Sequence, residues 1–337
     1  EFRLFNNRLW GDFNYYTRDD KDQIISVTSA PQSGYSTRKM NAGLIRNRGV
    51  ELSLGGMPVS TKNWKWEMNI AKNSNKLVEL ADGVDSYSIY WTSFTTRLYN
   101  YAMVGKSLGV ITGNTWERDD NGNIIFHELS ASQKALYGGE YVPTYNQNTL
   151  DELGNFHPDF TGGFNTSISF KNFRLSANID FSVGGQIVSY TNMWGSSSGI
   201  LDKTAELNDR GVNVREPVSK GGGIHMTGVD QDGNKVDTYV NAKLYYTTAS
   251  RVWEEWVYDR TYVKLREVSL SYVFPSQTLK KLNIGLSRAS VAINASNPWL
   301  IYSACPNVDV SEIGMGYFEG GNAAATRSIG FTVNLAF

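Results

Sequence analysis

Cysteine, histidine and long apolar runs are all scarce in this chain of 337 residues, and each scarcity excludes a class of protein. Cys305 is the only cysteine, so no disulfide can form within the chain. The three histidines, His127, His157 and His225, lie far apart and match no spacing of metal ligands, so we expect no zinc site. No apolar run approaches the ~18 residues of a membrane-spanning helix. The chain is therefore neither a disulfide-rich scaffold nor a helical membrane protein.

Charge is also nearly balanced, which excludes partners that are attracted by a strong field. The net charge is −1, so no potential draws in nucleic acid or an anionic membrane surface. The mean hydropathy of −0.36 is that of a soluble chain. A lipid-facing β-strand, however, alternates apolar and polar residues, and its average stays near neutral. Composition therefore leaves a β-barrel membrane protein open, and the 13% of aromatic residues fits one.

Alternation with a period of two, which is typical of β-strands, runs through the chain, and helical periodicity is almost absent. In FRLSANIDFSV (173–183) the apolar residues occupy one face and Arg174, Ser176 and Asn178 lie on the other. Residues 164–170 alternate in the same way, and Lys171-Asn172 joins the two strands as a two-residue hairpin turn. The other candidate strands are 2–5, 9–15, 50–54, 64–70, 267–274, 289–296 and 328–337, and the stretch 84–126 could add two more.

Short and long connections between these strands alternate strictly. The short ones lie near Asn6-Asn7 and at 58–63, 171–172 and 275–285. The long ones cover roughly 17–48, 71–162, 184–261 and 298–327. In an antiparallel meander every second turn lies on the same side, so the long connections gather at one end of the sheet. Outer-membrane barrels have this layout, with short periplasmic turns and long extracellular loops. The last strand then ends with Phe337 at the periplasmic rim.

The predicted fold class is all-β, part of an antiparallel transmembrane β-barrel. The alternative is a secreted or surface β-sandwich that binds carbohydrate without transporting it. The polar strand faces are rich in Ser, Asn and Gly and poor in Lys and Glu, and aromatic residues lie near strand ends; both features favour the barrel. A sandwich would be soluble and monomeric, whereas part of a barrel would need detergent or a complementary chain.

Several stretches resemble one protein family, in the order in which the family has them. They are NAGLIRNRGVELSL (41–54), WKWEMNIAKNSNKLVEL (64–80), GNFHPDFTGGF (154–164), YVKLREVSLSYVFP (262–275) and the aromatic terminal strand. The chain resembles the C-terminal half of the SusC/RagA-type TonB-dependent transporters of the Bacteroidetes outer membrane. Asn297-Pro298-Trp299 departs from the Asn-Leu that the family often has near this strand.

The resemblance implies a domain organisation. Residues 1–337 would form the C-terminal part of the barrel, with about 9–11 of the 22 strands of such transporters, and 184–261 would be a long extracellular loop. The plug domain and the N-terminal strands would be absent from this chain. Because residue 1 is Glu and no signal peptide precedes it, we expect a processed chain or a piece of a longer protein. Bare sheet edges are not viable in lipid, so a complementary N-terminal half is an expected partner.

The function that the resemblance implies is nutrient uptake across the bacterial outer membrane. The substrate would be a glycan (an oligosaccharide) or alternatively a peptide. Energy would come from the TonB complex through the missing N-terminal part, and a SusD-like lipoprotein would form a lid over the extracellular loops. Membrane lipid is a further partner, and nucleic acid is not. We expect no enzyme, because the adjacent Glu254 and Glu255 would point to opposite faces of a strand.

The long loop 184–261 carries the candidate substrate-binding residues. Tryptophan rings pack against the C–H faces of sugars, and carboxylate and guanidinium groups hydrogen-bond sugar hydroxyls. A peptide could use the same groups. The alternative is that these tryptophans pack the loop on itself or against a lid protein. The candidates are Trp194, Asp202, Arg251, Trp253 and Trp256.

One motif suggests a cofactor, Ca²⁺. In TWERDDNGNIIFHE (115–128), if Gly122 is position 6 of a calcium loop, the residues at positions 1, 3, 5 and 12 are Glu117, Asp119, Asn121 and Glu128. Position 1 is usually Asp and no flanking helices are evident, so an Asn-Gly turn is the alternative. The stretch 230–233 is a poorer copy that is typical of an Asp-Gly turn.

Overall fold

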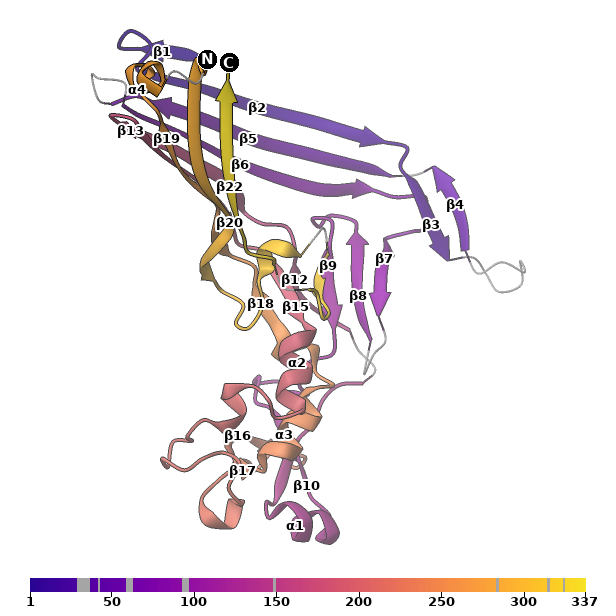
Figure 1. The fold of residues 1–337 in the computed structure, drawn as a ribbon. Coiled ribbons are helices and arrows are strands. Elements are labelled where there is room, and N and C mark those ends of the chain that lie inside the picture. The colour runs from indigo at the N-terminus through magenta and orange to yellow at the C-terminus, as the bar shows by residue number, and fades with distance from the viewer. Residues whose placement is uncertain are drawn as a thin grey trace.

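The computed structural model describes residues 1–28, 37–41, 43–58, 63–92, 97–147, 150–282, 285–313, 316–323 and 325–337. Its largest element is a sheet of nine strands, each antiparallel to its neighbours (Figure 1). The nine predicted strands are all confirmed. In order across the sheet they are β1 (Phe2–Leu4), β2 (Leu9–Lys21), β5 (Leu44–Gly56), β6 (Trp64–Glu79), β13 (Phe160–Phe170), β14 (Phe173–Val183), β19 (Tyr262–Val273), β20 (Arg288–Ser303) and β22 (Ser328–Ala336).

One face of this sheet is apolar and open. Directly paired residues share a face, so Phe13 lies beside Leu52 on β5, and Ile293 beside Phe331 on β22. Large apolar side chains on this face stay exposed: Phe13 by 60%, Ile293 by 54% and Phe331 by 67%. A β-sandwich would cover them with a second sheet. The sandwich alternative is therefore wrong, and the apolar face is that of a barrel wall.

The long connections lie at one end of the sheet, as predicted. β1–β2, β5–β6, β13–β14 and β19–β20 are joined by short segments at the end where both chain termini lie (Figure 1). The turn between β19 and β20 contains a short helix, α4 (Ser276–Leu282). Of the turn predicted at 58–63, residues 59–62 lie outside the described residues.

The predicted end of the strand at residue 296 is wrong, because β20 continues to Ser303. Its pairing with β19 shifts between Leu265 and Glu267, where Asn297 and Pro298 stand opposite a single residue. Asn297 has a positive φ of 49°. Proline donates no backbone hydrogen bond, so within sheets it is confined to edges and bulges. The bulge lets the strand pass Pro298 without losing its partner.

Aromatic rings cover glycines on neighbouring strands of the sheet. A Cβ added at Gly49 would lie 2.3 Å from the ring of Tyr16, and one at Gly55 would lie 2.3 Å from Trp10. In the strand register Gly49 stands directly opposite Tyr16, and Gly55 stands directly opposite Trp10. A ring that fills the space left by a glycine is a known means of fixing strand register. The Gly in RNRGVELSL is therefore needed for close approach of a side chain.

Smaller sheets and helices form within the long connections. The stretch 84–126 does not extend the barrel wall: β7 (Ser86–Thr92), β8 (Leu98–Met103) and β9 (Val110–Gly113) pair with β12 (Asp151–Asn155) in a separate sheet. Two further sheets contain β10 (Ile125–Glu128), β11 (Tyr141–Pro143), β16 (Ile224–Asp230) and β17 (Lys235–Val240), and β15 (Gln186–Ser189), β18 (Val257–Asp259) and β21 (Phe318–Glu319). A two-stranded sheet pairs β3 (Ile24–Thr28) with β4 (Thr37–Asn41).

The helices that the sequence did not reveal are short. They are α1 (Ala131–Tyr137), α2 (Tyr190–Ser197), α3 (Ala242–Ala249) and the 3-10 turns η2 (Asp202–Ala205), η3 (Val218–Lys220), η4 (Trp253–Trp256) and η5 (Val310–Glu312). Two turns of helix are too few to show a period of 3.6. Across the described ranges, none of the helices is long and apolar enough to span a membrane.

The main hydrophobic core lies outside the nine-stranded sheet. The connections 80–159, 184–261 and 304–327 pack together, and we call this unit the loop body (Figure 1). Its core takes Ile111 from the first connection, Met193 and Trp253 from the second and Tyr317 from the third. The loops of this wall therefore form one packed unit with its own buried side chains.

Candidate functional site

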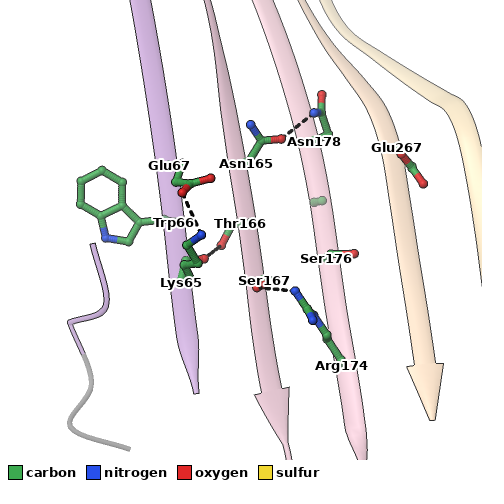
Figure 2. Close-up of a pocket in the computed structure, with 11 residues that line it drawn as sticks. Lys65, Trp66, Glu67, Asn165, Thr166, Ser167, Arg174, Ser176, Asn178 and Glu267 are labelled. Atoms are coloured by element: carbon green, nitrogen blue, oxygen red, sulfur yellow. Dashed lines mark hydrogen bonds and ion pairs between the residues drawn. The ribbon is translucent and has the colours of Figure 1, made fainter. Parts of the chain in front are cut away.

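The polar face of the sheet carries a groove of about 340 Å³ on β6, β13, β14 and β19 (Figure 2). The alternation of these strands aims charged and amide side chains at one side. Strand register brings together residues that are far apart in sequence. The polar side chains that line the groove are Lys65, Glu67, Asn165, Ser167, Arg174, Ser176, Asn178 and Glu267.

Some of these groups pair with one another, either along one strand or between neighbouring strands. The Lys65 ammonium lies 2.8 Å from a Glu67 carboxylate oxygen, and the Asn178 amide donates to Asn165 Oδ1 at 2.5 Å. Arg174 Nη2 lies 3.4 Å from Ser167 Oγ (Figure 2). The wall thus offers a polar solute hydrogen-bond donors, hydrogen-bond acceptors and charged groups of both signs. Nothing in this set of side chains suggests a nucleophile or a metal centre.

A buried lysine ties the loop body to the polar face. Lys264, on β19, is 1% exposed, and its ammonium donates to Asp309 Oδ2 at 2.7 Å, Glu312 Oε1 at 2.6 Å and Ser311 Oγ at 3.0 Å. Arg266 donates to Glu312 at 2.5 Å and to both oxygens of Asp180. A buried ammonium needs such partners because an unpaired charge is costly to bury. The segment around η5 is therefore held against the barrel wall by ion pairs.

The carboxylates of this anchor are held ionised. Hydrogen bonds from Lys264 and then Arg266 lower the pKa of Glu312 below its usual value, against the effect of burial. Burial alone would raise the pKa of Asp309, but the hydrogen bonds from Lys264 and Ser311 outweigh it and lower that pKa too. Both groups therefore stay charged at neutral pH.

The structure separates the predicted substrate-binding residues into two groups. Trp253 and Trp256 are 0% and 1% exposed and belong to the core of the loop body. Their rings have no free face for a ligand in this conformation, and the packing alternative describes their positions. Trp194 on α2 is 45% exposed, and Asp202 and Arg251 are exposed as well. Substrate binding by these three remains a prediction.

The carboxylates beside the buried tryptophans have a structural partner. Glu254 and Glu255 lie on η4, a 3-10 turn, so the expectation that they lie on a strand is wrong. Glu254 accepts from the Trp116 backbone at 3.1 Å and from Arg118 at 2.7 Å, and Glu255 accepts from the Trp116 indole at 2.6 Å. Both carboxylates therefore join η4 to residues 116–118.

The candidate calcium loop is a tight turn. The Asp119 carboxylate accepts hydrogen bonds from the backbones of Asn121 and Asn123 at 3.0 and 2.8 Å, and Gly122 has a positive φ of 83°. Glu128 lies on β10, with its carboxylate 2.5 Å from Lys134. Glu117 pairs through its backbone with Ile125 and Thr144. Within the described ranges, no three Asp, Glu, His or Cys residues are grouped as metal ligands. Calcium binding stays an untested prediction.

The loop body contains a second recess, a pocket of about 460 Å³, which the sequence did not reveal. The hydroxyl of Ser196 is buried beside it and has no hydrogen-bond partner among the described residues. Arg215 borders the pocket and donates to Thr204 Oγ1 at 2.5 Å. The serine-rich stretch 195–199 was the available signal, but its meeting with α3 depends on the tertiary fold. The lining is Leu136, Tyr137, Ser196, Ser197, Ser198, Gly199, Thr204, Arg215, Asn241, Ala242, Lys243 and Tyr246.

Comparison by sequence finds relatives that share one description. The chain is 28% identical over 316 residues to TonB-dependent receptor P3 of Formosa agariphila, which covers 91% of the chain and 29% of that protein. It is 24% identical over 371 residues to TonB-dependent receptor P26 of the same organism, covering 100% of the chain and 34% of the relative. TonB-dependent receptor SusC of Bacteroides thetaiotaomicron is 30% identical over 198 residues, 56% of the chain and 19% of SusC. No family model matches the chain.

Comparison by structure finds the same kind of fold. The RagAB peptide importer in its open-open state superposes with a TM-score of 0.69 at 18% identity, over 99% of this chain and 33% of that one. The closed-closed state gives a TM-score of 0.69 at 19% identity. The chain therefore spans about a third of the length of receptors P3 and P26 and of the RagAB chains, and its match to SusC covers 19% of that protein.

Proposed function

We propose that this chain, which is similar to TonB-dependent receptors that include SusC, forms the C-terminal part of the barrel of a SusC/RagA-type nutrient importer in the outer membrane. In this proposal the complementary N-terminal half supplies the remaining strands, the plug and the contact with TonB. The exposed edges β1 and β22 support the need for that half, because unpaired strand edges are not viable in lipid.

One observation carries the proposal: the nine-stranded wall is apolar on one face and polar on the other, and its long connections fold into one body at one end. The apolar face suits lipid, and the polar groove around Arg174 and Glu267 suits a water-filled lumen. A solute that passes such a wall needs a recess at the extracellular end, and the loop body has one beside Ser196. These features support the proposed role in import.

The loop body also has the features of a docking surface for a SusD-like lipoprotein. Exposed apolar residues, Trp194 by 45%, Ile200 by 77% and Leu207 by 68%, lie within 184–261. The proposal assigns this region to the extracellular side, where it contacts substrate and lid. The substrate is a glycan or a peptide. Tryptophan, serine and arginine groups recognise either, so a test of uptake must offer both.

Deletion of residues 190–250 from the complete transporter tests the assignment of the loop body. Cells that lack the native gene are complemented with the complete or the shortened transporter, and uptake of labelled oligosaccharides and of labelled peptides is measured. The proposal predicts loss of uptake and loss of co-purification with the lipoprotein. Uptake and lipoprotein binding at the level of the complete protein would overturn it.

Two exposed tryptophans provide a matched pair for a finer test. Trp194, on α2, and Trp299, on the β20 wall, are 45% and 58% exposed. Trp194→Ala should reduce uptake of the substrate, because an aromatic platform is lost at the extracellular end. Trp299→Ala removes a ring of the same size from the wall and should leave uptake unchanged. Equal effects would show that Trp194 has no special role.

A further inference from the structure

A basic groove lies on the apolar side of the sheet, directly beyond the last apolar rows of β2, β5 and β6. Its volume is about 310 Å³. Strand pairing fixes the face: Phe13 and Leu52 stand opposite one another, and along the same face Thr17 stands opposite Arg48 and Asp19 opposite Arg46. The lining residues are Arg46, Arg48, Ser74, Lys76 and Val78. At this level the outer face changes from apolar to cationic on β5 and β6, whereas β2 carries Thr17 and Asp19 there.

The groove has more positive charge than its neighbours neutralise. Arg46 donates to both oxygens of Asp19, at 2.7 and 2.8 Å, so this pair is internally balanced. Arg48 also attracts the Asp19 carboxylate, but among the described residues neither the exposed Arg48 nor the exposed Lys76 forms an ion pair of its own. Two cations, on neighbouring strands β5 and β6, are therefore available to an anion.

The position of these cations suggests which anion they bind. The row next to the groove contains Tyr15, 64% exposed, and Val50, 37% exposed, on the face that continues into the apolar wall. Beside them the Lys72 ammonium lies 4.9 Å from the centre of the Phe160 ring. A ligand seated here has its charged group at Arg48 and Lys76 and its apolar part along the wall. That is the shape of a membrane lipid with a phosphorylated headgroup.

We propose that this groove binds the phosphate group of a lipid in the leaflet at the long-loop end of the barrel. Arg48 supplies a planar donor fork that matches phosphate oxygens, Lys76 supplies a point charge, and Ser74 adds a hydroxyl donor between them. Arg46 also lines the groove, but its guanidinium is paired with Asp19. The lipid chains then cover Tyr15 and Val50. Headgroup binding requires only that the wall lies in a membrane, so uptake measured on the same variants separates it from the proposed import.

The test uses the complete transporter, purified in a mild neutral detergent. It is titrated with dioleoyl phosphatidic acid, with dioleoyl phosphatidylcholine and with inorganic phosphate, and bound ligand is counted by native mass spectrometry. Phosphatidic acid should bind more tightly than phosphatidylcholine, which has the same chains. Each Lys or Arg near a membrane surface adds to the binding free energy of an anionic lipid. The double variant Arg48→Gln with Lys76→Gln should therefore weaken phosphatidic acid binding about 30-fold. Arg48→Lys, which keeps the charge, should weaken it less.

The control removes two cations from the opposite face. Lys65→Gln with Arg174→Gln makes the same change of net charge and should leave phosphatidic acid binding unchanged. Equal weakening by both double variants would overturn the proposal, as would equal binding of the two lipids. Inorganic phosphate that competes as strongly as phosphatidic acid would reassign the groove to a free anion. If the double variant fails to fold, the salt dependence of the wild-type protein tests the proposal instead. Added salt must weaken the binding of phosphatidic acid and leave the binding of phosphatidylcholine unchanged.

Discussion

Lys264 and Glu312 meet at 2.6 Å, although they are 48 residues apart and belong to the barrel wall and to the loop body. The lysine is 1% exposed and the glutamate side chain 32% exposed, so the contact lies at the boundary between protein interior and water. This ion pair, together with Asp309, fixes where the connection 304–327 lies against the polar face. The anchor therefore links the strands of the barrel wall to the unit that we propose captures substrate.

Removal of the lysine should loosen the anchored segment. Lys264→Met keeps the length of the side chain but leaves Asp309 and Glu312 without their ammonium partner. We expect the free energy of local opening around η5 to fall by about 2–3 kcal/mol. Hydrogen exchange of residues 304–313 measures this opening. Lys65→Met breaks an exposed pair with Glu67 and should cost less than about 1 kcal/mol. Equal exchange in the two variants would contradict the anchor.

Acid should release the same segment. Hydrogen bonds from Lys264 and Arg266 lower the pKa of Glu312 in the folded state, so the folded state holds fewer protons than the open state. Its stabilising contribution is therefore fully present above the pKa of about 4.3 of a free glutamate and is lost as the pH falls through the lower folded value. Exchange of the η5 amides should increase below about pH 4. In Glu312→Gln this increase in exchange at low pH should be smaller. An increase as large as that of the wild-type protein would show that Glu312 does not cause the acid release of the segment.

Gly49 should tolerate no side chain while Tyr16 is present. A Cβ at Gly49 would meet the Tyr16 ring at 2.3 Å, which forces either the ring or the strand to move. Gly49→Val should lower the yield of folded, heat-modifiable barrel, by a cost of about 1–3 kcal/mol for overpacking. Tyr16→Ala in the same chain should restore part of the yield, because it empties the space. Gly330 is the matched control position, because a Cβ added there would have no atom within 4 Å. Gly330→Val should therefore not show this overpacking cost.

Cys305 reports the integrity of the segment that follows β20. The thiol is 1% exposed, and burial raises its pKa to about 12. Because the thiolate is the nucleophile, the native protein should react with iodoacetamide at least about a hundredfold more slowly than the denatured chain at pH 8. Mass spectrometry of timed samples gives both rates. Rapid labelling of the native protein would show that this part of the loop body is open.

The alternation of residues predicted which strands exist better than where they end. The predicted strand 173–183 matches β14 at both ends, because one face stays apolar and the other stays polar along its whole length. Strands β2, β5 and β6 extend well past the predicted 9–15, 50–54 and 64–70. Beyond the apolar rows their outer face carries Asp19, Arg46 and Lys76, so the alternation disappears although the pairing continues. The hydrophobic pattern marks the apolar part of the outer face, not the whole strand.

The candidate site was less predictable, since it depends on contacts between distant segments. Trp253 and Trp256 had the residue type of a sugar platform, and only the packing of three connections shows that they are buried. Lys264 was not singled out from the sequence, because its partners Asp309 and Glu312 lie beyond the next strand. The polar groove follows from alternation, whereas the pairing of Arg174 with Ser167 follows from register, which no single sequence displays.

Spin labels on adjacent residues of β20 test most directly whether this wall lies in a membrane. Ile293 is on the apolar face, and Asn294 is on the polar face, hydrogen-bonded to Thr332. In the complete transporter reconstituted in lipid, a label at Ile293 should be relaxed mainly by oxygen, which concentrates in the hydrocarbon. A label at Asn294 should be relaxed mainly by a water-soluble nickel chelate. Equal access of the nickel chelate to both positions would contradict a lipid-facing wall.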